Sequence, residues 1–255
     1  MTFTRHAWRL VAAVALISLA IPVPANTITA VELIRHIDSL WRGETSEARM
    51  TMTVKTDRYE RTMTMDAWSR GKEHSLVVIR EPVKDRDVAT LKVDNNIWNY
   101  LPKINRVTKI PASMMSGSWM GSHFTNDDLI KDSSFEADYS SVISYQGNRD
   151  GRAIIELTST ARVDAAVVWG KVLTEIDDKT LAPLAQRFFD EGGTLIRTMR
   201  FDQFKTIGER VVPMIMRLQP EDKPQESTVM VYDDIRFGVP LEATFFSLQN
   251  LRRRR

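Results

Sequence analysis

The first feature in the pattern of apolar and polar positions is a continuous apolar run near the N-terminal end of the chain. From Leu10 to Val23 nearly every residue is apolar, and the residues before this run include Arg5 and Arg9 but no acid. This order is typical of a secretory signal peptide, and the run is shorter than the roughly 20 residues that span a bilayer. We therefore predict a signal peptide over residues 1–25, cleaved near Ala25; an uncleaved N-terminal helix is the alternative.

Residues 29–43 follow the helical period. Thr29 and Glu32 have the spacing of a capping box, and Gly43 is suited to end the helix. Apolar residues recur at helical spacing, at Val31, Ile34, Ile37 and Leu40. Because only one face of this helix is apolar, we expect it to lie across a sheet.

From Glu47 onward the period changes from about 3.6 residues to 2, as in half-buried strands. A turn at Asp57 and Arg58 separates two such strands and makes a hairpin. The apolar positions of the two strands are Ala48, Met50, Met52, Val54, Tyr59, Met63, Met65 and Ala67. Further strands are predicted at 75–80, 88–93, 97–101, 107–110, 135–145, 153–159, 168–176, 185–190, 195–205, 211–218 and 227–237.

Two segments break the strand rhythm. Residues 112–124 mix glycine with large apolar side chains without a clear period, which is typical of a loop or lid. Asn126, Asp127 and Asp128 then favour the start of a short helix through Ile130. Residues 240–251 predict either a short C-terminal helix or an irregular segment that docks on the sheet.

More than ten short strands with few helices indicate an antiparallel meander, because parallel sheets need helical crossovers. A twisted sheet of this width curls to protect its edges. We therefore predict a mainly β (α+β) fold: one domain over residues 26–255, built as an unclosed antiparallel half β-barrel. The N-terminal helix and the helical or loop lid are expected to cover an apolar cavity on its concave face.

Composition and charge narrow the class of protein. The chain has no cysteine, so it depends on its core alone and cannot be acylated as a lipoprotein. The net charge is +2, of which Arg5 and Arg9 supply all, and cations and acids alternate along the rest. This balance argues against nucleic-acid binding, which needs a basic face. The exception is the run Arg252, Arg253, Arg254 and Arg255, which is either a solvated tail or a contact for anionic lipid head groups.

No arrangement of residues in the sequence predicts catalysis, a metal or a cofactor. There is no Gly-x-Ser-x-Gly elbow and no phosphate-binding loop, and the histidines beyond the signal segment are His36, His74 and His123. His123 and Asp127 could offer two metal ligands, but a usable site needs three or four. We predict a protein that is not an enzyme.

Methionine is the informative excess, because its flexible thioether suits surfaces that adapt to varied apolar partners. Ordinary core filling is the alternative for each one. Four methionines fall on one face of the first hairpin, beside the methionine- and tryptophan-containing loop. The predicted ligand-binding residues of the cavity and lid are Met50, Met52, Met63, Met65, Trp98, Tyr100, Met115, Trp119, Met120 and Phe124.

Residues 82–129 resemble the outer-membrane lipoprotein-sorting, LolA-like proteins. The resemblance is carried by Trp-Asn-Tyr-Leu-Pro at 98–102, Arg-Val-Thr-Lys-Ile at 106–110 and Gly-Ser-Trp-Met-Gly-Ser-His-Phe-Thr-Asn-Asp-Asp-Leu at 117–129. It implies an unclosed barrel with a lid, located in the periplasm, that binds acyl chains of a lipoprotein or lipid. It also implies a possible association with an RND-type inner-membrane exporter. The Gly-Ser-Trp-Met-Gly-Ser segment at 117–122 departs from LolA itself.

Two other functions remain open from the sequence. One is a scaffold or accessory subunit that docks an RND-type exporter, its cavity filled by its own lid. The other is an envelope hydrolase that depends on His123.

Overall fold

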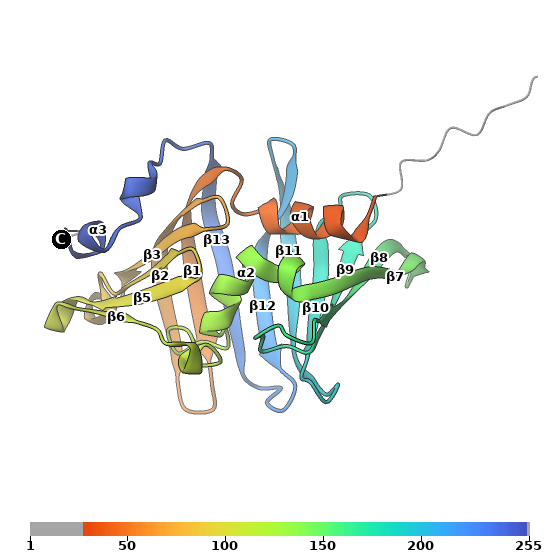
Figure 1. The fold of residues 1–255 in the computed structure, drawn as a ribbon, viewed down its shortest axis with the longest axis horizontal. Coiled ribbons are helices and arrows are strands. Elements are labelled where there is room, and N and C mark those ends of the chain that lie inside the picture. The colour runs from red at the N-terminus through yellow and green to blue at the C-terminus, as the bar shows by residue number, and fades with distance from the viewer. Residues whose placement is uncertain (1–27, 254–255) are drawn as a thin grey trace, which may run out of the picture.

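The protein forms one antiparallel sheet that curves without closing (Figure 1). The computed structural model describes residues 28–253, and the side chains of all of these except 130–134 and 252–253. The predicted half-barrel is therefore confirmed, whereas the predicted signal peptide and the side chains of the terminal arginine run lie outside the described residues. The strands are β1 (Thr45–Lys55), β2 (Glu60–Arg70), β3 (His74–Glu81), β4 (Ala89–Val93), β5 (Asn96–Leu101), β6 (Arg106–Lys109), β7 (Tyr139–Arg149), β8 (Arg152–Ala161), β9 (Lys171–Asp177), β10 (Pro183–Phe189), β11 (Leu195–Ile207), β12 (Arg210–Pro220) and β13 (Ser227–Phe237).

The strand order explains where the lid lies. The order across the sheet is β6-β5-β4-β3-β2-β1-β13-β12-β11-β10-β9-β8-β7, so two meanders meet where β1 pairs with β13. Among these strands, β6 and β7 are the consecutive pair that are not neighbours, and each forms one edge of the sheet. Residues 110–138 therefore cross the hollow of the sheet from one edge to the other.

The first helix, α1 (Ala30–Ser39), begins as the sequence predicts. The Thr29 backbone N–H donates to Glu32 Oε2 at 2.8 Å, and the Glu32 backbone N–H donates to Thr29 Oγ1 at 3.2 Å. Leu33, Ile34 and Ile37 form its buried face. Figure 1 shows α1 and α2 lying across the same face of the sheet, where an amphipathic helix can bury its apolar stripe.

The second helix, α2 (Asn126–Asp138), is longer than predicted. A capping box of Thr125 and Asp128 starts it, but it runs on to Asp138, so the predicted strand start at residue 135 is wrong and the strand, β7, begins at Tyr139. The Phe135 and Tyr139 rings stack with their centres 4.3 Å apart, across the end of the helix. Tertiary packing at the helix end thus overrides the alternating pattern of this short stretch.

The C-terminal residues cover the opposite face of the sheet. After the short helix at Ala243–Phe245, α3 (Leu248–Arg253) packs against β4. Phe246 and Leu251 are buried against Leu76, Leu91 and Tyr100 of β3, β4 and β5. This end of the sheet therefore buries apolar residues on its convex face as well as on its concave face, where Val77 of β3 and Ile97 of β5 lie. The predicted choice between helix and irregular segment is resolved as a mixture of the two.

Candidate functional site

A row of large apolar side chains crosses the concave face in register. Met63 of β2 pairs with Met52 of β1, Met52 pairs with Met230 of β13, and Met230 pairs with Met216 of β12. Phe201 of β11 continues the row beside Met216. Because strand side chains alternate between faces, these in-register partners all lie on one face of the sheet. The row therefore spans the centre of the concave face.

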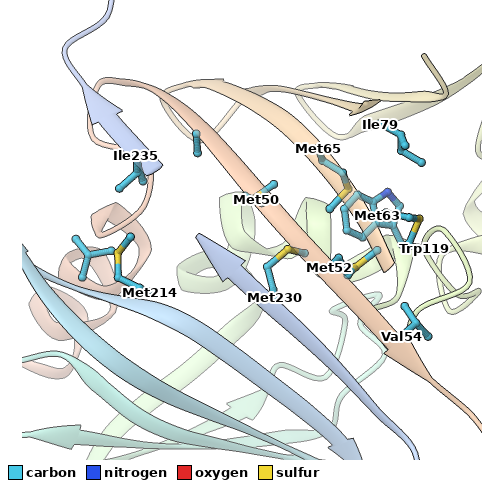
Figure 2. Close-up of a cluster of buried hydrophobic side chains, with 12 residues drawn as sticks. Met50, Met52, Val54, Met63, Met65, Ile79, Trp119, Met214, Met230 and Ile235 are labelled. Carbon is cyan, nitrogen blue, oxygen red and sulfur yellow. The ribbon is translucent and has the colours of Figure 1, made fainter. Parts of the chain in front are cut away.

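Trp119 covers one end of this row (Figure 2). Its ring lies over Met63 and Met65, only 3% of the residue is exposed, and Nε1 donates to Thr90 Oγ1 at 3.0 Å. The following Met120 and Gly121 both have positive φ, which turns the chain back over the sheet. The lid loop thus fills the part of the hollow over Met63 and Met65 of the first hairpin.

A cavity of about 290 Å³ occupies the rest of the hollow, beside Trp119, and is lined by strands of both meanders. Helices α1 and α2 form its roof. Strands from β3 across to β8, in the order of the sheet, form its floor. This volume is near the lower end of the range for ligand pockets. The lining side chains include Ile34, Ile37, Trp41, Ala48, Met50, Val77, Trp119, Phe124, Leu129, Phe135, Leu157, Trp169, Val172, Phe188, Met199, Phe201, Met216, Met230 and Tyr232.

The floor of the cavity also holds hydrogen-bonding groups. Thr174 of β9 lies in register with Gln186 of β10, and Gln186 Nε2 donates to Thr174 Oγ1 at 3.3 Å. Leu157 and Met199 lie in register on either side of this pair. The amide has a second N–H, so the pair could bind a carbonyl oxygen while the surrounding walls contact hydrocarbon.

Arg197 of β11 holds the roof of the cavity to its floor. The side chain is 5% exposed, and its Nη1 and Nη2 atoms donate to Asp128 of α2 at 2.9 and 2.6 Å. The guanidinium carbon lies 4.1 Å from the centre of the Trp169 ring and 4.3 Å from that of Phe188. Nη1 also donates to the backbone oxygen of His123 at 3.0 Å. One cation thus fixes both the lid loop and the start of α2.

A second polar contact holds the lid loop to β13. His123 Nδ1 lies 2.8 Å from Thr228 Oγ1, and Nε2 lies 3.0 Å from Glu226 Oε2. Hydroxyl, imidazole and carboxylate in this order resemble a nucleophile with its base and orienting acid. However, Thr228 is 0% exposed, so no substrate can reach its hydroxyl. The cluster is suited to holding the loop rather than to hydrolysis.

The contact with His123 gives a testable pH dependence. The hydrogen bond from His123 lowers the pKa of the Glu226 carboxyl below its ordinary value, against the opposing effect of burial. A carboxyl with a lowered pKa in the folded state stabilises the fold above its unfolded pKa of about 4.3, and this contribution is lost as the pH falls through the folded value. We expect Glu226→Gln to be less stable at pH 7 and to lose less stability on acidification than wild type. Urea unfolding between pH 7 and pH 3 measures this.

The matched control is Glu209→Gln, an exposed carboxyl in the β11–β12 turn. Its stability curve should follow that of the wild type. If Glu226→Gln also runs parallel to the wild type at every pH, His123 and Glu226 do not interact as the geometry indicates.

The structure brings together only some of the residues assigned to the cavity and lid from sequence. Met50, Trp119 and Phe124 line the cavity. Met115, itself in the lid segment, packs against Ile97 and Ile110. Met52, Met63 and Met65 are fully buried on the same face but beneath Trp119, and Met120 packs against their cluster.

Trp98 and Tyr100, which the sequence assigned to the cavity, do not line it. They point to the other face of β5, where Tyr100 is buried among Leu91, Phe246 and Leu251. Sequence reasoning also missed the cavity residues of the second meander, among them Gln186, Phe188 and Arg197. Strand periodicity identifies which residues share a face but not which face is concave.

Two further observations concern membranes and metals. Within residues 28–253, none of the helices is long and apolar enough to cross a membrane. In the same part of the chain, no three His, Asp or Glu side chains come together as metal ligands. His123 and Asp127 therefore do not belong to a group of three such side chains among the described residues.

Comparisons with known proteins place the chain in a family and define its fold. A family model described as "Uncharacterized protein" matches residues 71–253, and the chain belongs to this family. A comparison with curated protein sequences finds no match.

Three solved structures, one of them a LolA superfamily protein, share the fold. The outer membrane lipoprotein-sorting protein domain from Vibrio parahaemolyticus is 23% identical with a TM-score of 0.75, over 88% of this chain and 98% of that one. A LolA superfamily protein from Nitrosomonas europaea is 22% identical with a TM-score of 0.74, over 88% and 100%. A DUF1329 family protein from Desulfovibrio piger is 20% identical with a TM-score of 0.77, over 87% and 97%. The LolA-like resemblance seen in the sequence is thus confirmed at the level of fold.

Proposed function

We propose that this protein is a periplasmic carrier that takes acyl chains of a lipoprotein or lipid into the cavity and transfers them between components of the cell envelope. The observation that carries the proposal is the lidded cavity between the concave sheet and helices α1 and α2, lined mainly by apolar and aromatic side chains. Each methylene moved from water into such a cavity contributes about 0.8 kcal/mol. The LolA-like fold supports the same reading.

The polar pair in the cavity floor suggests that the ligand is an acyl ester or amide rather than a plain hydrocarbon. The second N–H of Gln186 can donate to one carbonyl oxygen, and Thr174 holds the amide in place. Walls of methionine and aromatic residues contact the rest of the chain by dispersion, which tolerates varied acyl groups. The proposed carrier is therefore selective for amphiphiles and indifferent to fine differences in chain structure.

The proposed cycle needs no catalytic group. Ligand entry requires the lid to move away from the sheet, because α1, α2 and the lid loop roof the cavity. The contacts that must break are polar and reversible: Arg197 with Asp128, and His123 with Thr228 and Glu226. Transfer to an RND-type exporter in the inner membrane is part of the same proposal and rests on the LolA-like resemblance alone.

The direct test places a charge where the acyl chain would lie. Met216→Glu puts a carboxylate on the cavity wall, and we expect it to weaken binding of a fluorescent long-chain fatty-acyl probe by tenfold or more, on the order of the cost of leaving a charge in apolar surroundings. Wild-type affinity should rise with chain length by roughly fourfold per methylene until the cavity is full. Probe titration of protein purified without detergent measures both.

The matched control is Arg217→Glu, which adds the same carboxylate to the neighbouring, exposed position on the other face of β12. It should leave probe affinity unchanged. Equal affinity of the Met216→Glu variant and wild type would refute acyl binding in this cavity.

One observation favours a second candidate function, a non-transport subunit that docks an exporter. Trp119 already fills the part of the hollow over Met63 and Met65. Protein that co-purifies with an exporter but never carries lipid, as judged by native mass spectrometry, would support this candidate over the carrier.

A further inference from the structure

A long stretch of the chain without acidic residues contains a surface that lies outside the cavity. From Asn95 to Asn126 the sequence contains no Asp or Glu, although the whole chain has 33 of them. The cations in this stretch include Lys103, Arg106 and Lys109. The structure places Lys103 in the turn between β5 and β6, and Arg106 and Lys109 on β6, at one edge of the sheet.

The tip of this edge hairpin exposes aliphatic side chains beside the cations. Ile104 is 63% exposed and Leu101 is 43% exposed, on either side of the exposed Lys103. In the described part of the chain, neither Lys103 nor Arg106 forms an ion pair. We call residues Leu101–Arg106 the edge tip. Single exposed aliphatics are common on protein surfaces, but two beside two cations, with no acid in the hairpin, are a pattern that fits a lipid surface.

The backbone of the edge tip is fixed rather than extended. Pro102 starts a short 3-10 turn, and Asn105 has the left-handed φ of 47° that reverses the chain. Tyr100 Oη donates to Asn105 Oδ1 at 3.3 Å. A rigid tip can present its aliphatic groups without losing conformational freedom on binding.

A second exposed apolar residue, Val83, lies at the same end of the sheet. The register pairs Val78 with Ala89 and Ala89 with Tyr100, so the β3–β4 connection and the edge tip extend from the same end of neighbouring strands. This connection carries the exposed Val83 and Lys84. Its two acids are engaged within the protein, Asp85 with Arg61 at 2.9 Å and Asp87 with Arg80 at 3.3 Å.

We propose that the edge tip, with Val83 and Lys84 beside it, docks the protein on an anionic phospholipid surface, the aliphatic side chains entering the head-group region and the cations contacting phosphates. Charge complementarity commits the surface to this partner: the exposed cations match lipid phosphates, and the exposed side chains are aliphatic rather than the aromatic rings that stack on bases of nucleic acid. This inference goes beyond ligand carriage, because the edge tip lies outside the cavity.

The test is sedimentation of the purified protein with vesicles. Wild type should pellet with vesicles of phosphatidylglycerol and phosphatidylethanolamine, less so at high salt, and not with phosphatidylcholine alone. Ile104→Asp and the double variant Lys103→Gln/Arg106→Gln should each weaken binding about tenfold, the order expected from losing the contribution of one or two cations or an inserted aliphatic group. Val163→Asp is the control, since Val163 is 100% exposed in the β8–β9 connection and should bind as wild type.

The other outcomes overturn the inference. It fails if wild type does not pellet, if the edge-tip variants bind as wild type, or if only replacement of Arg252–Arg255 reduces binding. The edge-tip residues and Val163 are exposed, so the unfolding curves of their variants should coincide with that of wild type and confirm the fold. Acyl-probe binding should persist in all of these variants, which separates failure of the docking surface from failure of the proposed carrier function.

Discussion

Arg197→Met is expected to lower the free energy of unfolding by about 3–5 kcal/mol, the range for removing one partner of a buried ion pair. The loss arises because Asp128 would remain under the lid without its cation, while the His123 backbone oxygen loses its donor. Methionine keeps much of the packing between the Trp169 and Phe188 rings, so the charge is the main change. Urea unfolding measures the loss, and faster hydrogen exchange at residues 123–129 locates it in the lid.

Two companion variants make the expected result specific. The double variant Arg197→Met/Asp128→Asn should recover most of the loss, because the uncompensated charge is gone. Arg35→Met breaks another ion pair to α2, with Glu136, but both partners are exposed to solvent, so the loss should be much smaller than that of Arg197→Met. A double variant no more stable than Arg197→Met would show that the cation acts through its ring contacts and not through Asp128.

Trp119→Ala is expected to cost about 3–5 kcal/mol of stability, as for other large aromatic side chains removed from a core. The same substitution should shift ligand preference toward longer acyl chains. Removing the indole uncovers Met63 and Met65, and the methionine row runs from there to Met230 and Met216 in the cavity wall. Probe titration with a series of chain lengths measures the shift.

Trp119→Phe is the control for this second prediction. It keeps most of the buried ring but removes the hydrogen bond to Thr90, whose hydroxyl still donates to Asn99. The expected loss is about 1 kcal/mol with no change in preferred chain length. If Trp119→Ala is destabilised but prefers the same chain length as wild type, the space it opens is not continuous with the cavity.

Local patterns predict much of the fold correctly. The alternation over residues 227–237 matches β13 at both ends, and the spacing of Thr29 and Glu32 predicts the capping box at the start of α1. Such signals depend on neighbouring residues alone. The strand start predicted at residue 135 is wrong because the conformation there depends on a long-range feature: this part of the chain connects the two edge strands of the sheet.

The site is less predictable because each of its parts depends on contacts distant in sequence. Trp98 and Tyr100 alternate as a buried strand face should, but the C-terminal segment makes the convex face apolar too, and the pattern cannot distinguish the two faces. Arg197 resembles any arginine on a half-exposed strand until Asp128, 69 residues earlier, is brought to it. The methionines were assigned to the correct face, but the sequence does not show that Trp119 lies over Met63 and Met65.

The pairing of the first strand with the last has a consequence for how the molecule is made. Ser46 meets Phe237 and Lys55 meets Ser227, so the two halves of the sheet are joined by residues almost at opposite ends of the chain. Such distant pairings form slowly, since a long loop must close before they contribute any stability. During synthesis the two halves can fold separately, but the methionine row is incomplete until Met230 of β13 pairs with Met52 of β1. A chain cut short before residue 227 would therefore leave two open edges in the middle of the sheet, where strands of other molecules could add.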